Sequence, residues 1–245
     1  MTEPDFFKKE RYFLPEQWII DKNSHHYATY FGSYDLILNL CPKSAKKVLD
    51  VGCGPGRLSY ELIKKGYEVT GIDYSSRAIE FAKIMVPEGK FYVLDLTNKK
   101  DFITFESSFD IIILREVLEH IDPKYHNQIL DYLFSLLDKD RILILTVPTK
   151  RVYRDPQKHY KHFDREEIVK LLEEHNFKVD KIIGNIRYDF WYKLMFNNKL
   201  INLFDALLAP PLLSKAFNKI YMKFFNQSPL DKCGRLIICS AKSIF

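Results

Sequence analysis

Lys47-Val-Leu-Asp-Val-Gly-Cys-Gly-Pro-Gly56 is followed shortly by Tyr67-Glu-Val-Thr-Gly-Ile-Asp73. The first stretch is an apolar run that contains an acid and then places glycine at alternate positions. Apolar residues at helical spacing follow it, at Leu58 and Leu62. This pattern predicts a strand, a tight turn and a helix. Glycine suits the turn because a side chain would hold the backbone away from a ligand, and because such turns often need a positive φ.

The second stretch predicts the next strand, which ends in an acid. Gly66 closes the preceding helix, and residues 67–72 lead directly to Asp73. A carboxylate at that point of a nucleotide-binding βαβ unit can accept hydrogen bonds from both hydroxyls of a ribose. The dinucleotide fingerprint requires a third glycine where this chain has Arg57. A dehydrogenase that uses NAD is therefore an alternative only if that glycine is immaterial.

Two motifs together carry a resemblance to a known family. The pattern D-x-G-x-G-x-G from Asp50 to Gly56, with an acid ending the next strand, resembles motif I of class I S-adenosylmethionine-dependent methyltransferases. The tract Phe109-Asp-Ile-Ile-Ile-Leu-Arg-Glu-Val-Leu-Glu-His-Ile121 resembles the segment after the fourth strand of ubiquinone-type methyltransferases. The resemblance covers residues 46–184 and the last strand. It implies an α/β fold with a doubly wound, mostly parallel seven-stranded sheet and helices on both faces.

The resemblance also implies how S-adenosyl-L-methionine, converted to S-adenosyl-L-homocysteine, would be held. Asp50 and the glycine turn would hold its methionine end, Asp73 its ribose, and Asp95 with Leu96 its adenine. An ordinary turn-forming acid is the alternative for Asp95. The cofactor-binding residues expected from the resemblance are Asp50, Gly52, Cys53, Gly54, Gly56, Asp73, Tyr74, Asp95, Leu96 and Arg115.

Methyl transfer from a sulfonium is an in-line displacement with a neutral leaving group, so alignment of the reactants matters most and can contribute ~7 to 11 kcal/mol. A base is needed only if the acceptor is protonated. His120 is the candidate base, because an unperturbed imidazole pKa of about 6.5 suits removal of a proton from a hydroxyl. The alternative is that the Glu119–His120 pair only stabilises its turn.

A further interpretation groups Glu116, Glu119 and His120 as a metal site. This E-x-x-E-H grouping resembles the metal-binding cluster of ubiquinone-type methyltransferases and of small-RNA 2′-O-methyltransferases, in which a divalent ion activates the acceptor hydroxyl. In the RNA enzymes another histidine completes the site, for which His159 and His162 are candidates. Carboxylates and imidazoles suit a hard or borderline cation. The pattern H-x-x-H-F also occurs in metal-free relatives, so a site without a metal stays open.

The length of 245 residues suits one domain. We expect an N-terminal cap segment (1–40), a cofactor-binding core (41–185), a helical insertion (186–232) and the last strand (233–245). The cap segment is rich in aromatic residues, and the resemblance implies that it covers the cofactor; plain hydrophobic cover of the core is the alternative. In the insertion, lysines line one face of an apolar helical pattern. That helix either covers protein or contacts a membrane surface through residues 201–225.

Composition limits the class of protein. The four cysteines form no C-x-x-C pair, and no apolar run reaches the ~18 residues of a membrane span. We therefore expect a soluble, cytoplasmic protein without disulfides. The net charge of +5 is spread along the chain, so it does not favour nucleic acid as a partner.

The sequence thus predicts a methyltransferase that acts on a hydroxyl of a small molecule, glycan or lipid-linked precursor. Two alternatives stay open: a metal-assisted RNA 2′-O-methyltransferase, and a catalytically silent interaction protein on the same fold. The acceptor itself and the oligomeric state are not indicated, because this scaffold hosts many substrates.

Overall fold

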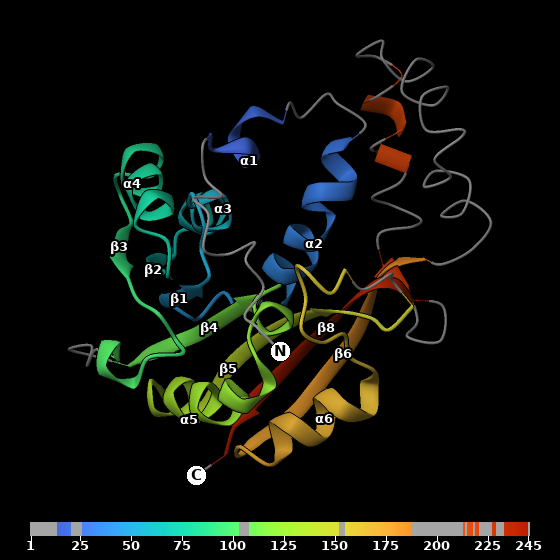
Figure 1. Cartoon of the computed structure of the whole chain (residues 1–245). Coiled ribbons are helices and arrows are strands. Elements are labelled where there is room, and N and C mark those ends of the chain that lie inside the picture. The colour runs from blue at the N-terminus through green and yellow to red at the C-terminus, as the bar shows by residue number, and fades with distance from the viewer. Residues whose placement is uncertain are drawn as a thin grey trace.

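The computed structural model describes residues 14–20, 26–102, 108–151, 155–187, 213, 215–217, 219–220, 227–228 and 233–244. Within them the chain forms one mixed sheet with helices on both faces (Figure 1). The strands are β1 Lys47–Val51, β2 Glu68–Asp73, β3 Lys90–Val93, β4 Phe109–Arg115, β5 Leu137–Pro148, β6 Phe177–Arg187, β7 Gln227–Ser228 and β8 Cys233–Ser243. The α-helices are α1 Glu16–Ile19, α2 His26–Leu40, α3 Arg57–Lys64, α4 Ser76–Met85, α5 His126–Ser135 and α6 Arg165–Glu173.

The strand order is β3-β2-β1-β4-β5-β8-β6-β7. Strands β1 to β5 pair in parallel, while β8 lies antiparallel between β5 and β6. The expected doubly wound α/β fold is confirmed, and β7 adds a two-residue eighth strand beside β6. The order reverses between β1 and β4, and ligands of such sheets bind outside the carboxyl ends of the strands at that reversal.

The continuous apolar run of residues 109–114 predicts a strand that is buried on both faces, and β4 lies between two hydrophobic layers. Ile112 and Leu114 pack into the core shared with α5 and α6. Ile111 and Ile113 pack on the opposite side, in the core shared with α2 and α3. A central parallel strand is buried on both faces, so it lacks the alternation of a half-exposed strand.

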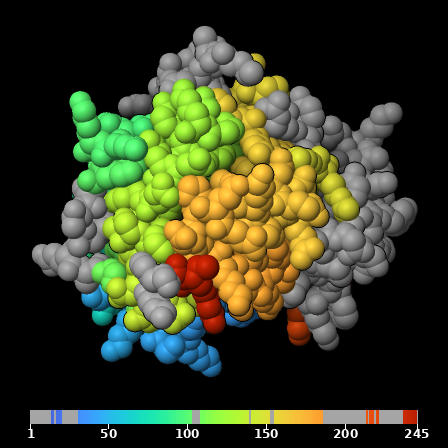
Figure 2. Space-filling model, turned by 90° about the horizontal axis from the view of Figure 1, so that it is seen from below, coloured from blue at the N-terminus to red at the C-terminus, as the bar shows by residue number. Residues whose placement is uncertain are grey.

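The two faces of the sheet are covered by different helices. In Figure 1 the helices α5 and α6 lie below the sheet, and α2, α3 and α4 lie above it. Figure 2, seen from below, shows the side chains of α5 and α6 side by side as one layer. The helices thus cover the two faces of the sheet. The predicted site residues lie instead at the carboxyl ends of β1, β2 and β4.

The helix ends follow the capping residues that the sequence indicates. The Ser75 hydroxyl accepts a hydrogen bond from the Ala78 N–H at the start of α4. The D-x-x-E pattern from Asp164 to Glu167 predicts a capping box, and the two residues form it at the start of α6. Gly66, with φ of +93°, follows α3 in the left-handed conformation that a helix end often requires.

Two strand boundaries differ from the sequence prediction. The sequence predicts one strand over residues 90–95 and another over residues 141–147, whereas β3 ends at Val93 and β5 begins at Leu137. Part of the predicted insertion lies outside the described residues, as do residues 1–13 and 21–25 of the N-terminal segment. No described helix has both the length and the hydrophobicity needed to cross a lipid bilayer.

Candidate functional site

The glycine turn after β1 uses backbone conformations that other residues rarely adopt. The φ angles are +69° at Gly52, +54° at Gly54 and +80° at Gly56. A Cβ atom on Gly52 would lie 2.4 Å from Cγ2 of Val117, in the segment after β4. The turn therefore needs glycine both for its conformation and for its close packing.

Asp73 ends β2 beside this turn. The Gly54 N–H donates to its Oδ2 over 2.9 Å, and the Ser75 N–H donates to its Oδ1 over 2.9 Å. An ionised carboxylate has about four lone-pair sites, so both oxygens can still accept bonds from a ligand hydroxyl. The predicted pairing of turn and acid is thus a direct contact, and each holds the other in place.

Asp50 lies beneath the turn rather than at its surface. Its side chain is buried, and the Ser59 hydroxyl donates to its Oδ2 over 2.6 Å. Burial raises the pKa of Asp50 to about 6, although the bond from Ser59 acts in the opposite direction. The expected contact of Asp50 with the methionine end of the cofactor stays a prediction, and the described contact supports the turn from below. Nothing in the sequence pattern singled out Ser59.

The residues expected at the adenine end lie just beyond β2 and β3. Asp95 Oδ1 accepts bonds from the backbone N–H and the hydroxyl of Thr97, both over 2.8 Å. Leu96 is buried, whereas Tyr74 is 44% exposed beside Asp73. Asp95 therefore forms a turn of the kind that the alternative interpretation describes, and its role toward adenine stays a prediction.

Cys53, another expected cofactor contact, is buried within the turn. Burial raises the pKa of its thiol well above the ordinary value, with the charges of Asp50 and Asp73 adding to the shift. The side chain is therefore a neutral, apolar part of the turn at neutral pH. Its backbone N–H donates to the Ile72 carbonyl and its carbonyl accepts the Gly56 N–H, both over 3.1 Å, so the residue shapes the turn, and its expected contact with the cofactor stays a prediction.

The N-terminal segment contacts the glycine turn directly. The indole Nε1–H of Trp18 donates to the carbonyl oxygen of Pro55 over 2.8 Å. The guanidinium of Arg57 lies 5.1 Å from the ring centres of both Trp18 and Phe31, and it pairs with Glu61 over 3.0 Å. The sequence placed Arg57 in the motif and the aromatic residues in a cap, but it did not indicate that they interact.

Arg115 ends β4, at the reversal of the strand order. Its Nε donates to the Ser33 hydroxyl over 3.3 Å, and its Nη2 lies 2.8 Å from Oε1 of Glu116. The Tyr34 ring lies 4.8 Å from the guanidinium carbon. Residue Glu116 has φ of +51°, an uncommon conformation for a side chain with a Cβ. Contacts from α2 and from Glu116 thus hold the positively charged guanidinium of Arg115 in one orientation at the edge of the expected cofactor site.

Glu119, His120 and His159 form a cluster whose ligand atoms all lie within 4.8 Å of one another. Glu119 is buried, and its Oε1 lies 4.0 Å from Nε2 of His120. The His120 Nδ1 is 2.8 Å from the carbonyl oxygen of Lys158, and the Glu119 carbonyl accepts the Tyr160 N–H over 2.7 Å. These bonds fix the turn after β4 against residues 158–160.

The cluster differs in part from the predicted metal set. His159 joins Glu119 and His120, while Glu116 pairs with Arg115 and is not among the converging residues. His162 is buried, and its Nε2 lies 2.7 Å from Nδ1 of His159, so it orients that ring. One carboxylate and two imidazoles are a donor set that Zn²⁺, Mn²⁺ or Fe²⁺ accepts, so the described residues fit a divalent ion.

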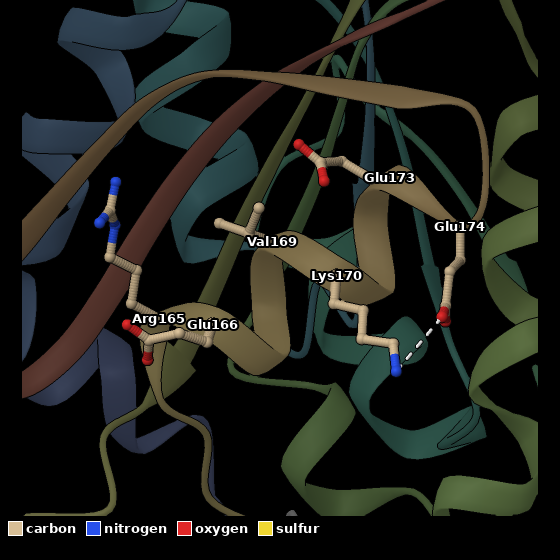
Figure 3. Close-up of a pocket in the computed structure, with 6 residues that line it drawn as sticks. All are labelled: Arg165, Glu166, Val169, Lys170, Glu173 and Glu174. Carbon is tan, nitrogen blue, oxygen red and sulfur yellow. Dashed lines mark ion pairs between the residues drawn. The ribbon is translucent and has the colours of Figure 1, made fainter.

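A separate hollow of about 540 Å³ lies on the outer side of α6 (Figure 3). It is lined by Arg165, Glu166, Val169, Lys170, Glu173 and Glu174. Lys170 and Glu174 form an ion pair over 3.7 Å along the helix. None of the expected cofactor or catalytic residues lines this hollow, so it is not the candidate active site.

Several curated relatives resemble this chain. The mitochondrial ubiquinone biosynthesis O-methyltransferase of Schizosaccharomyces pombe is 38% identical over 105 residues, which is 39% of this chain and 34% of the relative. The ubiquinone biosynthesis O-methyltransferase of Psychrobacter cryohalolentis is 30% identical over 155 residues, which is 60% of this chain and 56% of the relative. The matches thus span about a third to just over half of these two relatives.

A solved structure with the same fold is the N-methyltransferase NodS of Bradyrhizobium japonicum in complex with S-adenosyl-L-homocysteine. It covers all of both chains with a TM-score of 0.63, at 14% sequence identity. The family model described as a methyltransferase domain matches residues 24–182, which include the glycine turn, Asp73, Arg115 and the Glu119–His120–His159 cluster. The chain therefore belongs to the methyltransferase domain family.

Proposed function

We propose that this protein transfers a methyl group from S-adenosyl-L-methionine to a hydroxyl of a small molecule, glycan or lipid-linked precursor. The contact between the Gly54 N–H and the Asp73 carboxylate carries this proposal most directly. It joins a bare backbone turn to an acid at the end of the neighbouring strand. Such an arrangement suits a ribose whose hydroxyls both donate to one carboxylate.

The chain's own residues would align the reactants rather than activate the leaving group, which departs neutral. Asp73 would accept the ribose hydroxyls, and the bare glycine backbone of the turn would let the methionine end approach closely. Arg115 is suited to the cofactor carboxylate, since a guanidinium matches a carboxylate in geometry and charge. Its orientation is fixed by Ser33 and Glu116. Such positioning is the largest contribution that this site can make to the rate.

The Glu119–His120–His159 cluster would handle the proton of the acceptor hydroxyl. His120 would act as the base, with its ring oriented by the Lys158 carbonyl. A divalent ion held by Glu119, His120 and His159 would instead act as a Lewis acid that lowers the pKa of the hydroxyl. The names of the relatives, which refer to O-methylation in ubiquinone biosynthesis, support a hydroxyl of a small molecule over an RNA ribose.

Titration calorimetry with S-adenosyl-L-homocysteine tests the cofactor part of this proposal. We expect the wild type to bind and Asp73→Ala to bind at least about 10-fold more weakly, because hydrogen bonds to a charged group contribute about 1.5–3 kcal/mol each. Asp110→Ala is the matched control, since Asp110 accepts the N–H groups of Lys46 and Lys47 at the opposite end of the strands. Absence of binding by the wild type would overturn the proposal and favour a silent interaction protein.

We further propose that the insertion contacts an anionic membrane surface, which would bring a lipid-linked acceptor to the site. Residues 213, 215–217 and 219–220 are helical. Leu213 and Ile220 are 47% and 54% exposed, and they share one helical face, whereas the exposed Lys215 and Lys219 lie on another. An exposed apolar stripe beside lysines matches an interfacial helix.

We retain the cytoplasm as the proposed location, supported by three buried free thiols, Cys41, Cys53 and Cys239.

Flotation with vesicles tests this contact. We expect binding to vesicles that contain phosphatidylglycerol and weaker binding to pure phosphatidylcholine, with loss at high salt. Ile220→Glu should abolish flotation without changing affinity for S-adenosyl-L-homocysteine. Equal flotation with both vesicle types, or none with either, would contradict an electrostatic contact with a membrane.

A further inference from the structure

A buried histidine frames the turn that carries Glu119 and His120. The Nε2 atom of His126 lies 3.0 Å from the carbonyl oxygen of Leu118 and 3.1 Å from that of Ile121. A carbonyl oxygen can only accept, so Nε2 carries a proton and donates to both oxygens. The two oxygens belong to the residues on either side of the Glu119–His120 pair. The side chain of His126 therefore links the two ends of this turn through hydrogen bonds to its backbone.

The same imidazole contacts the second segment of the cluster. The ring of His126 lies 6.0 Å from the ring of Phe163, with 31° between the planes. Phe163 follows His162, which bonds to His159. His126 is the first residue of α5 and is buried, so its bonds are shielded from water. His126 thus contacts both segments that supply the cluster. These segments are the turn from Leu118 to Ile121 and residues 159–163.

We propose that His126 is a positioning residue for methyl transfer. It acts through the backbone of the turn from Leu118 to Ile121, and it sets the distance of the Glu119 carboxylate and the His120 imidazole from His159. It touches neither cofactor nor acceptor. A shift of about 1 Å in a catalytic group can cost about 100-fold in rate, so loss of these two bonds should appear mainly in kcat.

This inference rests on the proposed function only for its effect on turnover. The position of the turn is measurable without catalysis, by hydrogen exchange of the amides of residues 118–122. Failure of the wild type to bind S-adenosyl-L-homocysteine would overturn the proposed function, and the exchange result would still decide the role of His126. The two failures are therefore distinguishable.

The test compares His126→Phe, which keeps a ring but loses the donor, with His126→Gln, which keeps an N–H donor. The matched control is His175→Phe. His175 is also a buried histidine against α5, and its ring bonds to Asp131 over 2.7 Å and Asn127 over 3.3 Å. It contacts no residue of the cluster through these bonds. If His126→Phe does not fold, His126→Asn replaces it, because its shorter amide cannot reach both carbonyl oxygens.

We expect His126→Phe to lower kcat by about 10- to 100-fold, with KM and affinity for S-adenosyl-L-homocysteine within about twofold of wild type. Exchange of the amides of residues 118–122 should accelerate. His126→Gln should recover most of the lost kcat, and His175→Phe should lower Tm with kcat unchanged. The proposal is wrong if His126→Phe lowers Tm as His175→Phe does while kcat and local exchange stay at their wild-type values.

Discussion

Trp18 is hydrogen-bonded through its indole nitrogen to the carbonyl oxygen of Pro55, inside the glycine turn. This contact joins the N-terminal segment to the backbone that is expected to hold the cofactor. The side chain of Trp18 also packs edge-on against Tyr60 of α3, with 5.2 Å between ring centres. The segment is therefore attached at the site itself, and its contacts have consequences for ligand binding that can be measured.

Trp18→Phe should weaken binding of S-adenosyl-L-homocysteine by about 2- to 10-fold. The substitution keeps an aromatic ring over Arg57 but removes one hydrogen bond, which is worth about 0.5–1.5 kcal/mol. Calorimetry and stopped-flow release of the ligand provide the measurement, and we expect faster dissociation. If the segment is only hydrophobic cover, the affinity of the variant will equal that of the wild type.

Gly52→Ala should lose both stability and ligand binding. The left-handed conformation costs a residue with a side chain about 1–2 kcal/mol, and the new methyl group would collide with Val117. Gly66→Ala is the control, because Gly66 also has positive φ but its added Cβ would meet no atom within 4 Å. Urea denaturation should give a lower free energy of unfolding for Gly52→Ala than for Gly66→Ala. Adding Val117→Ala to Gly52→Ala should restore part of the lost free energy. Equal losses would show that packing against Val117 is unimportant.

Asp50 should make the unliganded protein less stable as pH rises. Its folded pKa of about 6 exceeds the ordinary carboxyl value, so the folded state binds the proton more tightly than the unfolded state. The loss of folding free energy that comes from ionising Asp50 develops as pH rises from about 4 through about 6, and it is complete at higher pH. Across the two-unit shift it amounts to about 3 kcal/mol.

Asp50→Asn should therefore stabilise the unliganded protein at pH 8 relative to the wild type, with a smaller gain at pH 5. Urea denaturation at the two pH values gives the comparison. We also expect weaker binding of S-adenosyl-L-homocysteine, since the charge beneath the turn is lost. A stability difference that does not change between pH 5 and pH 8 would contradict the raised pKa.

Glu119→Gln tests whether the cluster acts with a metal. If a divalent ion is required, a chelator should inactivate the wild type and added Mn²⁺ should restore it, whereas the variant should stay at least about 10-fold less active at the same Mn²⁺ concentration. Direct titration with Mn²⁺, read by electron paramagnetic resonance, should show weaker binding by the variant. A wild type that is indifferent to the chelator and binds no Mn²⁺ would leave His120 as a base without a metal.

The fold could be predicted from the sequence because local patterns agree with the global arrangement. The glycine turn, the apolar run of β4 and the capping box at Asp164 each have one structural interpretation, and the structure confirms all three. The edge strand β7 has only two residues, which is too short to produce a periodic pattern. The early end of β3 reflects the Asp95–Thr97 turn, a local hydrogen bond that competes with strand pairing.

The site was predictable in its residue types but not in its contacts. Asp73 and the glycines follow from spacing along the chain, whereas the approach of His159 to His120 depends on how residues 155–163 fold back over the turn after β4. Glu116 illustrates the limit most clearly. Its place in E-x-x-E-H suggests a ligand, whereas the structure shows its carboxylate paired with the adjacent Arg115, a contact that the motif does not indicate; its role toward a metal stays a prediction. His126 had no motif at all, because its role depends on backbone carbonyl groups that any sequence supplies.

The position of β8 has a consequence for how the protein must be made. This strand is the last of the sheet in sequence, yet it separates β5 from β6. Until it emerges from the ribosome, each of those two strands exposes an unpaired edge, and open edges invite association with other chains. The sheet can therefore close only after residues 233–243 have been synthesised, and a stop codon ahead of residue 233 would leave both edges open and yield a product prone to aggregate.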